Sequence, residues 1–270
     1  MKPVITTALA ILGLAAGAAT VAAFGQGESP GTTKKKVLVE LYTSQGCDSC
    51  PPASDLVGRL AELGFGPDQI VPVNFHVDYF NDPWVDPFSE AAYSRRQWSY
   101  NTVQGRNDLY FTPMMMVDGR TPLLGSNRPA ALAAIGKALK EPPGVALKLA
   151  LDGNAGTRTL TAEVASLANG AVGRDLLVGV AVVEDQVTTK VLSGENAGKT
   201  LVEPFTVRSF AHKFIRLERT GTKTVTFPLR LANDSVAGRC RVAVFVQDRA
   251  NGKVYQADAV PWAEAGRVAR

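Results

Sequence analysis

The sequence predicts an α/β domain over residues 37–141, followed by an all-β, sandwich-like domain over residues 145–262. In the first part, short apolar strands alternate with segments of helical periodicity, which is typical of a parallel sheet covered by helices. In the second part, short alternating runs are separated by turns, as in an antiparallel sandwich. The two patterns meet at Glu141-Pro142-Pro143-Gly144, where the composition is that of a linker.

The composition is that of an ordinary globular protein and excludes several other classes. Hydrophobic residues make up 46% and charged residues 20% of the 270-residue chain, and the net charge is +4. The basic residues are scattered, and the only dense run is Lys34-Lys35-Lys36. We interpret this run as a solvated flank, and we expect no nucleic-acid partner.

The N-terminus has the layout of an export signal. One lysine precedes an uncharged run, Val4 to Phe24, that is rich in alanine and ends in small residues. We therefore predict a signal peptide or N-terminal anchor over residues 1–24 and a flexible leader over residues 25–36. The run is long enough to span a bilayer, but its hydrophobicity is modest, so we favour a cleaved signal. The protein is then periplasmic or secreted, or held by a membrane anchor.

The α/β domain is predicted to follow the order β-α-β-α-β-β-α. Val37 to Tyr42 reads as a strand buried on both faces, apart from Glu40. A helix then begins near Cys50, with two prolines in its first turn. The remaining elements are strand 70–77, a helix capped by Ser89 that runs to about Asn101, strand 111–117, strand 121–124, and a helix opened by Asn127.

The β domain is predicted from six short alternating runs, and no helix or fixed-period repeat is expected there. The runs are Val145 to Leu151, Thr157 to Ala165, Leu176 to Val183, Lys223 to Leu231, Arg239 to Gln247 and Val254 to Val260. Cys240 lies on the apolar face of one of them, so we interpret it as a buried free thiol.

The motif Ser44-Gln45-Gly46-Cys47-Asp48-Ser49-Cys50-Pro51-Pro52-Ala53 carries the chemistry. A Cys-x-x-Cys pair in an exported protein is compatible with a disulfide, a redox pair or half of a zinc site. Together with His76 to Tyr79, Thr112-Pro113 and Gly194 to Gly198, the motif resembles a secreted thioredoxin-like family of unknown function. This resemblance covers most of the chain beyond the N-terminal segment, and it implies a thioredoxin-like α/β domain before the sandwich-like domain.

The resemblance implies roles for four residues. Cys47 is the more accessible cysteine and attacks, whereas Cys50 resolves the mixed disulfide. The positive end of the helix favours a thiolate by about 0.3–1 kcal/mol. Pro113 follows a cis bond and shapes substrate docking. Glu40 assists proton transfer to Cys50, although an acid at a strand edge that reaches solvent is an equal alternative.

One residue opposes strong activation of the pair. The carboxylate of Asp48, next to Cys47, disfavours a thiolate. The corresponding intervening residues of thioredoxin are uncharged, so this is a departure from the pattern that the resemblance implies. We therefore expect a thiol that is not strongly oxidising.

Other candidate residues have a structural and a functional interpretation. His76 is a possible proton shuttle or metal ligand, but a histidine bonded to the Asp78 loop is favoured. Trp84 and Phe88 can line a substrate groove or pack a loop. Met114 to Met116 resemble copper ligands, but neighbours on a strand face opposite ways, which favours core packing.

Two further motifs are rejected as functional sites. Gly194 to Thr200 resembles a phosphate loop but is one residue short between its glycines. His212 lacks the neighbouring residues that a hydrolase triad requires, and the sequence contains no G-x-S-x-G motif.

The leading hypothesis is an exported thiol–disulfide oxidoreductase with protein or small-thiol substrates, a possible redox partner protein and no dissociable cofactor. The first alternative is a copper- or zinc-handling protein that uses Cys47, Cys50 and His76. The second is a non-catalytic binding module in which the cysteines form a structural disulfide.

Overall fold

The computed structural model describes residues 1, 34–167, 170–219 and 221–263. Apart from residue 1, the predicted signal peptide or anchor and most of the predicted leader lie outside these residues. From Lys34 onward, the described residues belong to one compact unit. Among the described helices, none is both long and apolar enough to cross a membrane.

The first half of the unit follows the predicted order of elements. It contains β1 (Val37–Thr43), α1 (Pro51–Gly58), β2 (Ile70–His76), α2 (Ala91–Gln104), β3 (Met114–Val117), β4 (Thr121–Leu124) and α3 (Arg128–Ala138). Asn127 caps α3 as predicted, because its side chain accepts from the Ala130 amide. The cap of α2 is Glu90 rather than Ser89, whose hydroxyl bonds the Asp86 carbonyl instead.

The second half contains the six predicted strands and three that the sequence did not reveal. The predicted ones are β5 (Val145–Gly153), β6 (Thr157–Ser166), β7 (Asp175–Glu184), β11 (Thr222–Arg230), β12 (Cys240–Asp248) and β13 (Val254–Pro261). The unexpected ones are β8 (Val187–Lys190), β9 (Thr200–Glu203) and β10 (Thr206–Arg216). A short 3-10 helix, η1 (Ala237–Arg239), precedes β12.

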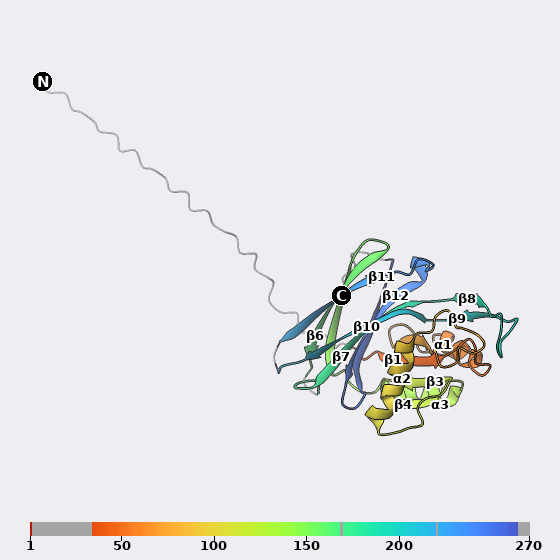
Figure 1. The fold of residues 1–270 in the computed structure, drawn as a ribbon. Helices are drawn as coiled ribbons and strands as arrows, with labels where there is room; N and C mark the ends of the chain where they lie inside the picture. Colours follow the sequence, from red (N-terminus) through yellow and green to blue (C-terminus); the bar gives the residue numbers. More distant parts are fainter. Residues whose placement is uncertain (2–33, 168–169, 220, 264–270) are drawn as a thin grey trace. The chain divides into compact units, whose positions relative to one another are not determined.

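The predicted fold class, a thioredoxin-like α/β domain followed by a separate sandwich-like domain, is wrong. The structure is mostly β, with 43% of the described residues in strands and 16% in helices. One mixed sheet of eight strands, in the order β13-β12-β7-β10-β2-β1-β3-β4, runs through both halves of the chain. The two halves join where β10 pairs with β2, at Thr206 and Asn74 (Figure 1).

The helices cover opposite faces of the α/β part of this sheet. Val39 and Leu41 of β1 pack against α1 and α3 on one face. Leu38 and Tyr42, which alternate with them, pack against α2 on the other face. A third cluster lies between β5, β6 and β11 and the strands β7 and β12. The β8–β9 hairpin lies beside α1 (Figure 1).

The lysine run before β1 is part of the fold and not the solvated flank that we expected. The Lys35 side chain is buried and pairs with Asp118 at 3.0 Å, while its ammonium also donates to the Val254 carbonyl. Burial raises the pKa of Asp118 to about 6, although Lys35 partly offsets this. Lys36 forms a 2.5 Å ion pair with Asp258 of β13. The run therefore anchors the start of β1 to the last strand.

Candidate functional site

Cys47 and Cys50 form a disulfide in the tight loop between β1 and α1. Their Cα atoms are 5.5 Å apart, which is in the normal range for a bridged pair. Cys50 is the N-cap residue of α1, and Pro51 and Pro52 occupy the first turn. The predicted placement of the pair at a strand–helix junction is therefore confirmed, and Cys50 lies at the positive end of the helix.

Both cysteines are buried, so the expected accessibility of Cys47 is not seen in the oxidised protein. The exposed fraction is 2% for Cys47 and 1% for Cys50, whereas Asp48 and Ser49 between them are exposed. The Cys47 sulfur lies 3.3 Å from the Ser49 hydroxyl. An attacking thiolate can therefore reach the sulfurs only after a small opening of the surrounding loops.

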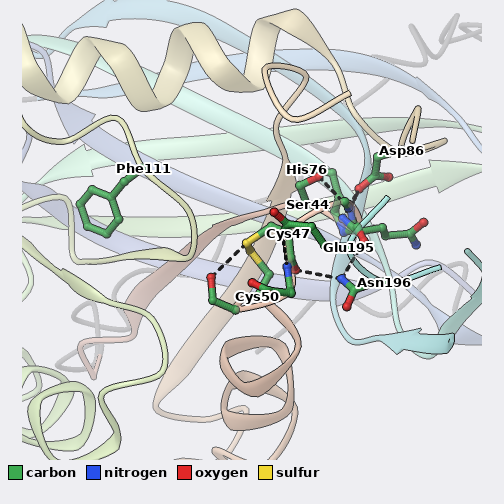
Figure 2. The surroundings of a disulfide bond; sticks show 12 residues. Ser44, Cys47, Cys50, His76, Asp86, Phe111, Glu195 and Asn196 are labelled. Atoms are coloured by element: carbon green, nitrogen blue, oxygen red, sulfur yellow. Dashed lines mark hydrogen bonds and ion pairs between the residues drawn. A yellow bond between two sulfur atoms is a disulfide. The ribbon is translucent and has the colours of Figure 1, made fainter. Parts of the chain in front are cut away.

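Asp86 holds the loop that carries Cys47 from one side. Its Oδ2 atom accepts a 2.8 Å bond from the Gln45 amide and lies 2.7 Å from His76 Nδ1. Its Oδ1 atom accepts from the Phe88 amide at 3.0 Å. Burial favours the neutral acid, but His76 and these amides lower the pKa of Asp86. A buried carboxylate thus links the end of β2 to the residues before Cys47 (Figure 2).

His76 is fully buried and is bonded to Asp86, which belongs to the loop of residues 78–87, so the expected bond to the Asp78 loop is confirmed. Burial lowers the pKa of His76, but the Asp86 and Glu203 carboxylates outweigh this, so the net shift is upward. The described residues contain no group of three or more His, Cys, Asp or Glu side chains placed to hold a metal ion.

The loop of residues 194–198 holds the Cys47 loop from the other side. Asn196 is fully buried, and its amide donates to the carbonyls of Gln45 and Cys47 at 2.9 Å each. Glu195 accepts from the Asp48 amide at 2.9 Å. In the sequence this loop contributed only to the family resemblance and to a rejected phosphate motif. Figure 2 shows it beside Cys47.

Gly46 lets the Cys47 loop pack closely against residues 80–84. A Cβ atom on Gly46 would lie 2.9 Å from the Phe80 carbonyl oxygen, which is too close. Trp84, half-buried, donates from its indole to the Gln45 side chain at 3.3 Å. Phe88 packs edge-on against His76, with ring centroids 5.6 Å apart. These two aromatic residues therefore support the site from within the loop.

Glu40 is placed on the opposite face of the sheet from α1, so the structure does not bring it together with Cys50. Its Oε1 atom accepts from Arg96 at 2.7 Å and from Tyr42 at 2.9 Å. Its Oε2 atom accepts from Tyr100. The carboxylate is completely buried, which also excludes the strand-edge alternative.

The Thr112–Pro113 bond is cis, and Pro113 is buried near α1. A Cβ atom on Gly125 would lie 3.0 Å from Ala53 and 3.3 Å from Pro113, so these residues flank Gly125. Figure 2 shows Phe111, two residues earlier, on the other side of the disulfide from Asn196.

The remaining sequence-based interpretations concern packing. Met114, Met115 and Met116 are completely buried in two different clusters, which confirms core packing. Cys240 is a buried free thiol on the core face of β12, as predicted. Burial raises the pKa of its thiol to about 11, which makes it unreactive.

We expect Asn196→Ala to loosen the Cys47 loop. The change removes the donor to the Gln45 carbonyl and one of the two donors to the Cys47 carbonyl, at a cost of about 1–3 kcal/mol in the free energy of unfolding. Urea denaturation of the oxidised protein measures this loss. Ala197→Ser, at the exposed neighbouring position, is the matched control and should stay within about 0.5 kcal/mol of wild type. Equal midpoints for the two variants would contradict the holding role of Asn196.

Comparison with known protein families identifies the family of the chain. A family model described as a protein of unknown function (DUF1223) matches residues 38–247, so the chain belongs to this family. A comparison with curated proteins gives no match.

Two solved structures have a similar fold. A structural-genomics crystal structure of a protein from Agrobacterium tumefaciens has a TM-score of 0.64 and 23% identity, and the alignment covers 87% of this chain and 98% of that one. HBP35 of Porphyromonas gingivalis has a TM-score of 0.67 and 15% identity, with 89% and 79% covered. At these identities the likeness concerns the fold alone.

Proposed function

We propose that the protein is a thiol–disulfide oxidoreductase that acts through Cys47 and Cys50. The observation that carries this proposal is the bridged pair at the N-terminus of α1, where Cys50 is the N-cap residue. The helix dipole stabilises a thiolate at this position by about 0.3–1 kcal/mol. A thiolate that is stabilised there is a better leaving group when the disulfide is attacked.

The reaction transfers two electrons from a protein or small-thiol substrate to the Cys47–Cys50 disulfide. A substrate thiolate attacks the Cys47 sulfur, a mixed disulfide forms, and Cys50 leaves as a thiolate. The second substrate thiol then attacks its own sulfur in the mixed disulfide and releases reduced Cys47. The substrate leaves as a disulfide, and its two protons end on the two cysteines. The reverse sequence, with Cys47 as nucleophile and Cys50 as resolving thiol, oxidises the pair again.

The surroundings of the pair favour moderate reactivity and selective access. The exposed Asp48 carboxylate opposes a thiolate on Cys47. Pro113 stays in the proposal as a docking residue because it lies close to the first turn of α1. We assign no proton-transfer role to Glu40, because both of its carboxylate oxygens accept hydrogen bonds from Arg96, Tyr42 and Tyr100.

We also propose that the protein acts outside the cytoplasm. The support is the sequence alone, in which one lysine and a long uncharged run precede the folded unit. An exported location is periplasmic or secreted, with or without the N-terminal run as an anchor. A disulfide between two cysteines persists in such a compartment.

A second candidate, a binding module stapled by a structural disulfide, is favoured by one observation. Both sulfurs are almost inaccessible, and the loop of residues 194–198 holds the backbone of Cys47 and Asp48. A structural disulfide of this kind resists reduction by glutathione, whereas a redox-active pair exchanges with it. The two candidates therefore differ in one measurable property.

Equilibration with glutathione separates the two candidates. We expect the pair to lose and regain two thiols reversibly as the ratio of reduced to oxidised glutathione changes, without a disulfide forming between two chains. The measurement is a thiol count in a Cys240→Ala background, so that only Cys47 and Cys50 contribute. After reduction, iodoacetamide should modify Cys47 before Cys50. A pair that no glutathione buffer reduces would support the stapled module instead.

A further inference from the structure

A cluster of buried polar groups lies under α1, next to the disulfide. Of the described side chains that keep a buried polar atom without a hydrogen-bond partner, six belong to this region: Thr43, Ser54, Asn74, His76, Glu203 and Thr206. All six are at most 3% exposed. Buried polar atoms are normally satisfied by protein groups or by ordered water, so such a concentration requires an explanation. We call this set the buried polar cluster.

The strand register brings four of these side chains together. Thr43 of β1 lies opposite His76 of β2, and Asn74 of β2 lies opposite Thr206 of β10. Asn74 and His76 are two residues apart, so all four side chains point to one face of the sheet. Ile70, on the same face of β2, packs with α1, which shows that this is the α1 face.

The other two members come from elements that cover this face. Ser54 lies four residues after Cys50, so both are on the same side of α1, one turn apart. Glu203 ends β9, and the next residue, Pro204, would contact a Cβ atom on Gly58 at 3.4 Å. The Asn74 amide donates to the Pro204 carbonyl at 2.7 Å, which joins this strand end to β2. The buried polar cluster therefore extends from the disulfide helix to β9.

His76 is the basic group of the cluster and is influenced by two carboxylates. Asp86 binds its Nδ1 atom, and Glu203 also raises the pKa of His76. The Nε2 atom of His76 and the Oε2 atom of Glu203 are the ionisable members without a partner. Both carboxylates favour the charged imidazole over the neutral one, so His76 is the member of the cluster that retains a proton.

We propose that His76 and Glu203 hold a proton that the buried polar cluster exchanges with Cys50 during the redox cycle. This inference rests on the proposed function and assigns a role to a carboxylate from the second half of the chain. When a substrate dithiol breaks the S–S bond, Cys50 leaves with the electron pair and takes this proton. The second proton of the dithiol then replaces the one that was lent, and the first, released when the attacking thiolate formed, ends on Cys47 when it leaves the mixed disulfide. His76 and Glu203 are positioning residues here, because they act through the hydroxyl groups or water of the cluster.

Imidazole titration by NMR tests the coupling directly. The chain has two histidines, and His212 is exposed, so a His212→Gln variant assigns both signals. We expect the pKa of His76 to differ between the oxidised and the dithiothreitol-reduced protein, while that of His212 stays the same. Because Glu203 raises the pKa of His76, Glu203→Gln should lower it. A His76 titration that is identical in the two redox states would overturn the proposal, even if the variant failed to fold.

The pH profile of reduction by dithiothreitol is the second measurement. A positioned acid–base group increases the rate of a proton-transfer step by about 10²–10⁴-fold. Glu203→Gln should therefore slow the reduction of the disulfide by about 10²-fold and remove one inflection from the plot of rate against pH. The matched control is Glu62→Gln, an exposed acid that pairs with Arg59 and should keep the wild-type profile. If wild type exchanges but Glu203→Gln has the same profile, only this inference fails. If wild type itself does not exchange, the proposed function fails.

Discussion

Replacing Cys47 by serine is expected to reduce thiol–disulfide exchange to the rate of the buffer without protein. The variant cannot form the mixed disulfide through which electrons pass, and Cys50 is left without its partner. A three-residue separation closes a short loop, so the loss of the disulfide should lower the free energy of unfolding by only about 2 kcal/mol. The folded variant can therefore be assayed with glutathione and with a reduced, unfolded protein substrate.

Two further cysteine variants control this result. Cys50→Ser should trap a mixed disulfide on Cys47, which mass spectrometry detects as an adduct of the substrate thiol. Cys240→Ala should exchange at the wild-type rate, because this buried thiol lies on the core face of β12. Full activity of the Cys47→Ser protein would show that Cys47 is not the nucleophile. Absence of an adduct on the Cys50→Ser protein would show that Cys50 is not the resolving thiol.

The largest stability change is expected for Arg96→Leu. Arg96 is buried and donates to Glu40 at 2.7 Å and to Gln247 at 3.2 Å. Its guanidinium also lies 4.7 Å from the centre of the Phe245 ring. Removal of the cation leaves a buried carboxylate whose remaining donors are tyrosine hydroxyls, and breaking such a pair costs about 3–5 kcal/mol. Urea denaturation should show this loss.

The neighbouring arginine provides a matched control. Arg95→Leu changes the same residue type on the exposed side of α2 and should stay within about 0.5 kcal/mol of wild type. The double variant Glu40→Leu/Arg96→Leu should recover part of the loss, because neither charge is then left unpaired. An Arg96→Leu protein as stable as Arg95→Leu would show that the pair contributes nothing to folding.

Local sequence patterns predicted most of the secondary structure correctly. Both strands at the centre of the α/β part are apolar and lie beside helices with clear caps or prolines, as at Asn127. The six strands predicted in the second half are also present, because their apolar residues alternate and face one core. Signals of this kind come from a few consecutive residues, so one sequence is enough to read them.

The wrong fold class has a local cause, which is the missed strand β10. Most of its residues are at least partly exposed, and the stretch from Arg208 to Arg216 mixes aromatic, basic and small residues. This pattern does not distinguish a strand from a loop. Yet β10 pairs with β7 along most of its length and with β2 at one end. Without β10, nothing in the sequence indicates that the two halves share a sheet.

Only part of the site could be predicted, because local patterns place the cysteines but not the side chains that contact them. The position of Cys47 and Cys50 follows from a strand, a tight loop and two prolines in sequence. The side chains that hold the loop come from distant segments, and spacing carries no information about such contacts. For Glu40, the sequence leaves a buried acid and a solvent-exposed one as equal alternatives, and the side chain is in fact buried on the face of the sheet that carries Arg96.

The contact between Asn196 and Cys47 joins residues 149 positions apart, which matters for the order in which the chain is made. Synthesis proceeds from the N-terminus, so both cysteines emerge long before the residues that cover them. During that interval the thiols are open to oxidants and to any enzyme that introduces disulfides. Once the 194–198 loop and β9 have been made and packed, the pair is covered and exchanges only when these loops open. The nascent chain, and not the finished protein, therefore gives the easiest opportunity to set the first oxidation state of the pair.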